Sequence, residues 1–149
     1  MTMDDATWAR HANPYSVYSR FTTLPLLTLA IWSRVWLGWW CLIPIALTIL
    51  WIWYNPRAFS PPKSTDNWAS RITLGERLYL NRQNVPIPEH HAPVLKIIMV
   101  IATSGICILI YGLFFLIPWA AICGLLLSAV SKLWFVDRMV WLYMERSKA

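Results

Sequence analysis

Apolar residues are gathered into long runs along this chain, and charged residues lie mostly between the runs. Residues 35–54 carry no charge, and a helix of this length, at about 1.5 Å per residue, just crosses the roughly 30 Å of hydrocarbon in a bilayer. Residues 94–117 and 119–142 form two further apolar runs, joined at Pro118 with almost no loop. Each of these three runs is therefore predicted to be a transmembrane helix.

A fourth span is predicted near the N-terminus. Residues 21–33 are uncharged but too short, and they reach full length only when the helix extends back through Arg20 to Pro14, where proline suits the first turn. Arg34 then marks a tight turn between antiparallel helices. The expected fold is an all-α integral membrane protein, a single membrane domain over 1–149, with two hairpins whose spans are 14–33, 35–54, 94–117 and 119–142.

The polar loop 55–93 is predicted to contain a short helix at the membrane surface. Asp66 is a suitable N-cap after the proline-rich stretch FSPPKST, and the helix runs as far as Arg82. Arg71, Gly75 and Arg82 fall on one side of it, framed by Trp68 and Tyr79, so this face could hold a phosphate group. The leucines of the same helix lie around its circumference and not on one face. The helix could therefore be buried between partners instead of lying on lipid.

Composition supports a membrane protein. The chain is 58% hydrophobic and 13% charged, with a mean hydropathy of +0.47, whereas a soluble domain is nearer 45–50% apolar and about 25% charged. The eleven tryptophans suit the headgroup level of a bilayer, where indole rings act as anchors. The three cysteines lie in apolar runs and form no ligand spacing.

The distribution of basic residues predicts the orientation. All of the thirteen lysines and arginines except Arg34 and Lys132 lie in or beside the N-terminal segment, the middle loop and the C-terminal tail. By the positive-inside rule, both termini and the loop should face the cytoplasm of a prokaryotic inner membrane. Topology and contact with anionic lipid then account for the net charge of +6, so no nucleic-acid partner is expected.

Two basic residues are predicted to share one depth within the membrane. Counted from the outer ends of their helices, Arg20 and Lys132 each lie about 20 Å along. Each could extend its side chain toward the headgroups, or both could face inward around an anion. Asp137 is one candidate for that anion, and the phosphate or carboxylate of a bound lipid is another. A bound phospholipid is the expected ligand, and the candidate anion-binding residues are Arg20, Arg71, Arg82, Lys132 and Arg138.

The last helix also carries a patterned face. Trp134, Asp137, Arg138 and Trp141 follow the i, i+3, i+4, i+7 spacing, which places two charges between two indoles. This face could pack against the loop or a neighbouring subunit through cation–π contacts, or it could be an interfacial belt where the helix leaves the membrane.

The histidines are the remaining candidates for chemistry. A metal or haem site would combine His11 with His90 or His91 and with a carboxylate such as Asp66, Glu76 or Asp137. His90 and His91 follow closely spaced prolines, so they should point to different sides of an extended segment. The candidate catalytic residues are His90, His91, Glu76 and Asp137, although no metal, nucleotide or serine-hydrolase motif is present in the sequence.

Several sequence blocks resemble a small family of prokaryotic membrane proteins described only as a domain of unknown function. These blocks are HANPYSVYSR, AIWSRVWLGWW with NPR, TDNWASRITLGERLYLNR with PIPEHH, and KLWFVDRMVWLY, and they span nearly the whole chain. The resemblance implies the four-helix membrane fold and brings no activity, cofactor or catalytic residue.

Three functions are compatible with these features. The first is a non-catalytic subunit or scaffold that packs against a larger membrane complex or its own copies and binds anionic lipid at the cytoplasmic face. The second is a membrane enzyme acting on a lipid-like substrate at that face, with a metal or haem as possible cofactor. The third is a small oligomeric anion channel lined by Arg20 and Lys132.

Overall fold

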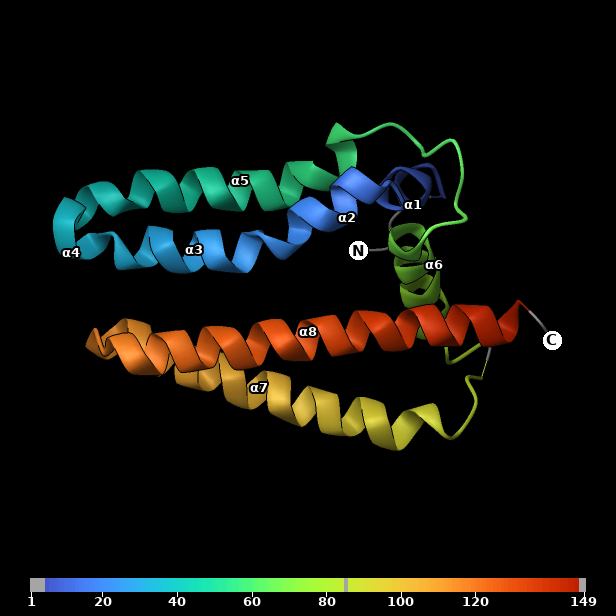
Figure 1. Cartoon of the computed structure of the whole chain (residues 1–149). Coiled ribbons are helices and arrows are strands. Elements are labelled where there is room, and N and C mark those ends of the chain that lie inside the picture. Colours follow the sequence, from blue (N-terminus) through green and yellow to red (C-terminus); the bar gives the residue numbers. More distant parts are fainter. Residues whose placement is uncertain (1–4, 85, 148–149) are drawn as a thin grey trace.

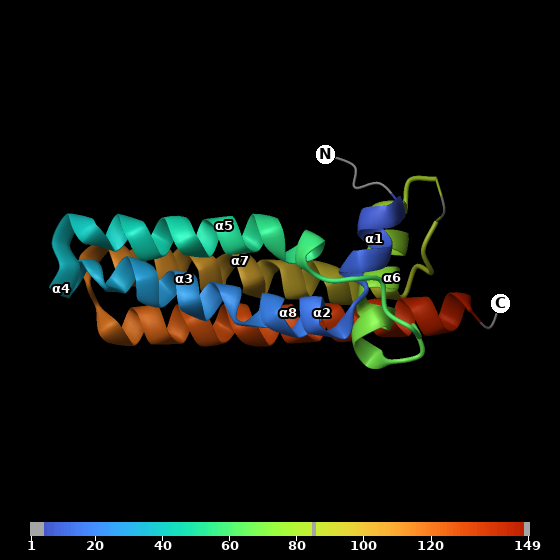
Figure 2. The same ribbon diagram turned by 90° about the horizontal axis from the view of Figure 1, so that it is seen from above.

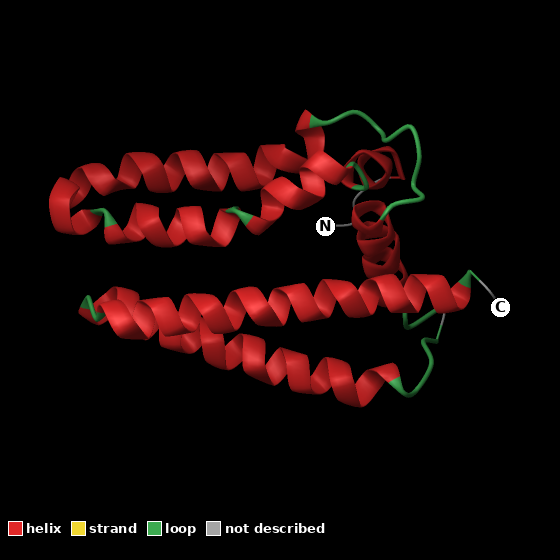
Figure 3. Ribbon diagram, in the orientation of Figure 1, coloured by secondary structure: helices red, strands yellow, loops and turns green. Residues whose placement is uncertain are grey.

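The computed structural model describes residues 5–84 and 86–147, and every regular element within these ranges is helical (Figure 3). The expectation of an all-α fold is confirmed for this part of the chain. In order, the elements are α1 (Asp5–His11), α2 (Pro14–Phe21), α3 (Thr23–Trp32), α4 (Arg34–Leu37), the 3₁₀ helix η1 (Gly38–Cys41), α5 (Leu42–Ala58), α6 (Trp68–Leu80), α7 (His91–Phe115) and α8 (Pro118–Arg146).

Three helical segments among the described residues are long and apolar enough to cross a membrane, judged by length and composition. They are Pro14–Ala58, His91–Phe115 and Pro118–Arg146. The first, of 45 residues, is far longer than one crossing requires, and Figure 1 shows that it doubles back at α4, so that α3 and α5 lie side by side. The middle loop is shorter than its predicted range of 55–93, because α5 continues to Ala58 and α7 begins at His91.

Both reversals of the chain lie at the same end of the molecule (Figure 1). Gly38 has φ 54° and ψ −130°, a backbone conformation that essentially only glycine adopts, and it allows α4 to turn into η1. The turn between α7 and α8 places Leu116 in the left-handed region at φ 56°, and Pro118 then begins α8.

The opposite end holds the polar elements. Figures 1 and 2 show α1 and α6 there, beside the last turns of α8. Helix α6 begins one residue later than predicted, since the side chain of Asn67, and not that of Asp66, accepts a hydrogen bond of 2.8 Å from the backbone N–H of Ser70. The prediction of Asp66 as N-cap was therefore wrong, although Asp66 is the adjacent residue.

Helix α8 packs against both α6 and α7, and glycines let these neighbours approach it closely. A Cβ on Gly75 would lie 2.0 Å from the carbonyl oxygen of Met139, and one on Gly124 would lie 2.2 Å from the backbone nitrogen of Leu109. Backbone-to-backbone contact of this kind is typical of helix packing within membranes. The two glycine contacts lie at different levels of α8, where α6 approaches Met139 and α7 approaches Gly124.

Large apolar side chains cover much of the outer surface. Trp36, Trp39 and Trp119, which lie at or near the two chain reversals, are 73%, 87% and 80% exposed. In a protein in water such exposure would cost free energy, whereas at the boundary of a bilayer it is favourable.

Candidate functional site

Two cations from different helices meet at one carboxylate. Glu76 of α6 lies 3.8 Å from Nη1 of Arg20, which belongs to α2, and accepts a hydrogen bond of 3.4 Å from Nζ of Lys132 of α8. Arg20 and Lys132 therefore share one level, as the count along the helices predicted. Their partner is different from the predicted one, because Asp137 was the candidate carboxylate and Glu76 takes that place.

His11 and Thr73 complete this cluster. Arg20 donates from Nη1 to Nε2 of His11 and, at 3.4 Å, from Nη2 to Oγ1 of Thr73, whose hydroxyl donates to the backbone carbonyl of His11 at 3.2 Å. Because a guanidinium can only donate, Nε2 of His11 accepts and its ring proton lies on Nδ1. We call His11, Arg20, Thr73, Glu76 and Lys132 the ionic cluster.

The ring of His11 is held neutral. Burial is the main cause, and the nearby charges of Arg20 and Lys132 act in the same direction, so the pKa of His11 is lowered from an ordinary 6.5 to about 3. With His11 neutral, the ionic cluster holds two basic side chains and one acidic one, an excess of one formal positive charge.

Local sequence explains how Arg20 reaches this position. Asn13 caps α2, with its side chain accepting from the backbone N–H of Tyr15 at 2.9 Å, and Pro14 follows in the first turn. One turn after Arg20 the hydroxyl of Thr23 donates back to the Arg20 carbonyl at 2.7 Å, at the break between α2 and α3. The break lies beside the ionic cluster and separates it from the apolar helix α3.

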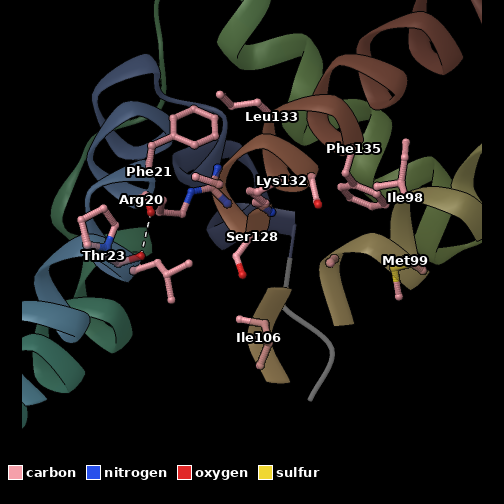
Figure 4. A pocket seen from close by; sticks show the side chains of 15 residues that line it. Arg20, Phe21, Thr23, Ile98, Met99, Ile106, Ser128, Lys132, Leu133 and Phe135 are labelled. Atoms are coloured by element: carbon pink, nitrogen blue, oxygen red, sulfur yellow. Dashed lines mark hydrogen bonds between the residues drawn. The ribbon is translucent and has the colours of Figure 1, made fainter. Parts of the chain in front are cut away.

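An apolar cavity of about 550 Å³ begins at the ionic cluster and lies between α3, α7 and α8. Figure 4 shows Arg20 and Lys132 close together at this cavity, with Ile106 on the α7 side and Ser128 on α8. Most of its other lining side chains are aliphatic or aromatic. The cavity thus combines a mainly apolar wall with two basic side chains at one edge.

The ionic cluster also lines a second, smaller cavity of about 320 Å³, which reaches α5 at Ile52 and Pro56. Arg20 and Lys132 line both spaces. Within the described part of the chain, Nε of Arg20 and Nδ1 of His11 are buried and have no hydrogen-bond partner. Such unpaired buried donors are uncommon in folded proteins.

The other predicted anion-binding residues lie elsewhere. Arg71 is paired with Asp66, the guanidinium of Arg82 lies 4.4 Å from the ring centroid of Tyr79, and that of Arg138 lies 4.8 Å from Trp141. These three arginines do not join the ionic cluster.

The phosphate-holding face predicted on α6 is not free to act as one. Gly75, which was expected to let a phosphate approach the backbone, contacts Met139 of α8 instead. Ile72 of the same helix is 1% exposed and packs against Val136. The alternative reading, in which this helix is buried between partners, describes α6 better, and its partners lie within the chain.

The exposed face of α8 contains the predicted cation–π contact. Trp141 is 56% exposed and lies beneath Arg138, and Trp134 is 39% exposed. Asp137 lies between the indoles on the same face and is partly buried.

The histidines occupy two separate places, so the prediction that His11 joins His90 or His91 was wrong. His91 and His90 lie 3.0 and 3.3 Å from Oε2 of Glu145, measured from Nε2 of each ring. Neither Glu76 nor Asp137 is their partner. The two rings also do not point apart, because a turn at Pro88 begins α7 at His91 and the ring centroids lie 4.4 Å apart.

Sequence reasoning missed Glu145 for a simple reason. The fourth span was predicted to stop at residue 142, whereas α8 continues to Arg146. In a hairpin the start of one helix faces the end of the next, so a carboxylate in the last turn of α8 was the available partner for histidines at the start of α7.

Fold and site together define an all-helical protein with helices long and apolar enough to cross a membrane. Arg20 and Lys132 lie at the edge of its apolar cavity. A family model described as "Family of unknown function (DUF6653)" matches residues 1–149, and the chain belongs to this family. The resemblance to a family without assigned activity is thereby confirmed. No curated protein and no solved structure gives a significant match to the chain.

Proposed function

We propose that this protein is an integral membrane protein with four spanning helices in two hairpins, which binds an anionic amphiphile between the hairpins. The observation that carries the proposal is the excess positive charge of Arg20 and Lys132 over Glu76 at the edge of an apolar cavity. The headgroup would contact the two cations, and an acyl chain would fill the cavity.

Dimensions support the spanning arrangement. Trp119 and Trp141 are both exposed and lie 22 residues apart on α8, which corresponds to about 33 Å along a helix, close to the thickness of the hydrocarbon layer. Lys132 lies 13 residues from Trp119, or about 20 Å, and so within the inner third of the layer. An anionic headgroup reaching this depth would be neutralised in a place where an unpaired cation is costly.

Chemistry supports an amphiphile in preference to a small anion. The cavity volume of about 550 Å³ falls in the usual range for ligand pockets, and its wall is mainly apolar. A small anion would satisfy the charge and leave this space without an apolar occupant. A phospholipid and a fatty acid share the required chemistry, and their masses distinguish them.

The test compares two lysine variants. In Lys132→Gln the cavity loses one cation, whereas in Lys96→Gln an exposed lysine of α7 outside the cavity is lost. We expect wild type and Lys96→Gln, gently extracted from the membrane, to carry about one anionic amphiphile per chain in native mass spectrometry. Lys132→Gln should lose at least about tenfold in retention, equivalent to about 1.4 kcal/mol. Equal retention in the two variants would refute the proposal.

A second pair of variants tests the apolar part. Ala102→Phe puts a large ring into the cavity, and Val100→Phe adds a ring to the outer surface of the same helix, where Val100 is 60% exposed. Only Ala102→Phe should displace the acyl chain. Loss of the amphiphile from both variants, or from neither, contradicts a chain lying between α3, α7 and α8.

We propose for the wider role a non-catalytic subunit that packs against a larger membrane complex or its own copies. The exposed indoles and Arg138 on α8 support this role, since aromatic residues and arginine are enriched at protein interfaces. Native mass spectrometry of the protein from its own membrane tests it. Additional protein mass would support a subunit, and a single chain with lipid alone would count against it.

We propose an orientation in the prokaryotic inner membrane with the polar end, including α1 and α6, on the cytoplasmic side. The termini themselves lie outside the described residues. In a background lacking the three native cysteines, Lys63→Cys in the loop should be protected from an impermeant thiol reagent in intact cells, and Leu37→Cys at the turn should be labelled. The reverse pattern would invert the topology.

A further inference from the structure

Three potential metal ligands converge at the end of the α7–α8 hairpin, away from the ionic cluster. They are His90, His91 and Glu145, and their ligand atoms all lie within 4.8 Å of one another. Nε2 of His91 and Nε2 of His90 both face the same carboxylate oxygen, at 3.0 and 3.3 Å. No other group of three or more such residues in the described part of the chain is so arranged.

Packing holds the buried member of the three, His91, in place. His91 is 1% exposed, and the neighbouring Leu95 of α7 and Leu142 of α8 are buried in one apolar cluster. Arg146 donates to the carbonyl of Pro86, which ties the segment before His90 to the end of α8. Two ligands therefore come from the start of one helix and the third from the end of its neighbour.

The donor set suits a specific class of ion. Imidazole nitrogens with a carboxylate oxygen are a common ligand set for Zn²⁺ and related divalent transition metals. Bonds of about 2.0–2.1 Å in a tetrahedral site place neighbouring ligand atoms about 3.3 Å apart. The two separations from Glu145 Oε2, 3.0 and 3.3 Å, are close to this spacing, and all three ligand atoms lie within 4.8 Å of one another, so the side chains are near enough to share one ion.

We propose that His90, His91 and Glu145 bind one divalent transition-metal ion of the zinc class, with the remaining coordination position open to solvent. His90 and Glu145 are 62% and 46% exposed in their side chains, so an ion has a path to the site. The bound ion would clamp the start of α7 to the end of α8. This site is independent of the proposed amphiphile and lies on different side chains.

The direct experiment is metal binding to the intact, detergent-solubilised protein with a non-histidine affinity tag. After treatment with a chelator, Co²⁺ is titrated as a spectroscopic probe, and Zn²⁺ is used to displace it. Wild type should bind one Co²⁺ per chain with the visible ligand-field bands of a low-coordinate site, and Zn²⁺ should abolish them.

Two variants at exposed positions test the assignment without disturbing the core. His90→Ala and Glu145→Gln should each weaken binding at least about tenfold. Glu89→Gln, at the adjacent exposed carboxylate, and His11→Gln, at the histidine of the ionic cluster, should bind as wild type. His91 is left unchanged because its burial makes a folding defect the expected result of replacing it.

Thermal unfolding supplies a second measurement. An ion that binds only the folded state raises the midpoint, so Zn²⁺ should raise the Tm of wild type and Glu89→Gln, and not that of His90→Ala or Glu145→Gln. The proposal is overturned if the chelated wild type takes up no stoichiometric metal. It is equally overturned if His90→Ala and Glu145→Gln retain the wild-type affinity.

Discussion

Ser16 donates a buried hydrogen bond of 2.9 Å to Oδ1 of Asn55. The two residues lie at or near the Asn-Pro pairs of the chain, Asn13-Pro14 at the start of α2 and Asn55-Pro56 in the last turns of α5. Asn55 is fully buried, and its Nδ2 donates to Oγ of Ser19 at 2.6 Å. A single amide therefore joins the two helices of the first hairpin at their polar end.

Asn55→Ala should destabilise the protein by about 1–3 kcal/mol, because the buried hydroxyl of Ser16 loses its acceptor and the bond to Ser19 is lost as well. Asn84→Ala, at an exposed position of the loop, is the control. Thermal unfolding in detergent measures the effect. If the two variants have the same midpoint, the amide contributes nothing to the hairpin.

Gly75→Ala should separate α6 from α8. The added methyl would lie 2.0 Å from the carbonyl oxygen of Met139, and backbone atoms on both sides have little freedom to move. We expect a loss of about 3 kcal/mol. Leu80→Ala, on the exposed side of the same helix, should cost much less. The variants are compared by denaturant unfolding, and an unchanged stability for Gly75→Ala would contradict the observed contact.

The stability of the protein should fall on acidification because of His11. Its pKa is lowered to about 3 in the folded state, so between pH 6.5 and 3 the unfolded chain binds the extra proton. The contribution of His11 to the free energy of unfolding is complete above pH 6.5. It is lost as the pH falls, and the free energy of unfolding then decreases by up to about 1.4 kcal/mol per pH unit.

His11→Gln isolates that contribution, since the amide oxygen can still accept from Arg20 and does not titrate. The difference in unfolding free energy between wild type and this variant should change with pH over the window. Parallel curves for the two proteins would show that His11 is not protonated on unfolding.

Arg34→Ala should weaken the attachment of the two hairpins at the turn end. Arg34 donates to the carbonyls of Leu113 and, at 2.7 Å, Phe114, which belong to the last turn of α7 and have no partner within a helix. The expected cost is about 1–2 kcal/mol. Arg34→Lys should restore part of it. Unfolding measured by tryptophan fluorescence should rank the stabilities as wild type, then Arg34→Lys, then Arg34→Ala. An Arg34→Ala protein as stable as wild type would contradict this prediction.

The two hairpins are linked at both ends, and this explains why a cavity lies between the two links. Arg34 links the hairpins at the turn end, and the ionic cluster links them at the polar end. Between these points the first hairpin contacts α7 and α8 mainly through Leu24, Ile31 and Trp32, which pack beside Leu109 and Leu113. The remaining length borders the apolar space that Ile106 and Ser128 line.

The level of a residue along its helix followed from the sequence, whereas most pairings did not. Counting residues along two apolar runs predicted that Arg20 and Lys132 share one level, because helical rise is constant. The count carries no information about which acidic residue lies across from them. Glu76 stands there because α6 is positioned by the contact of Gly75 with Met139, a tertiary contact without a sequence spacing.

The sequence by itself determined the helical class and the separation of polar from apolar segments, since a bilayer requires satisfied backbone hydrogen bonds and apolar runs of a given length. Only the tertiary structure decided the partners of the charged and titratable groups. His90 and His91 meet Glu145, and Arg20 and Lys132 meet Glu76, because helix packing brings together residues 54 to 56 positions apart. Contacts of such range depend on the relative placement of whole helices, which local periodicity does not encode.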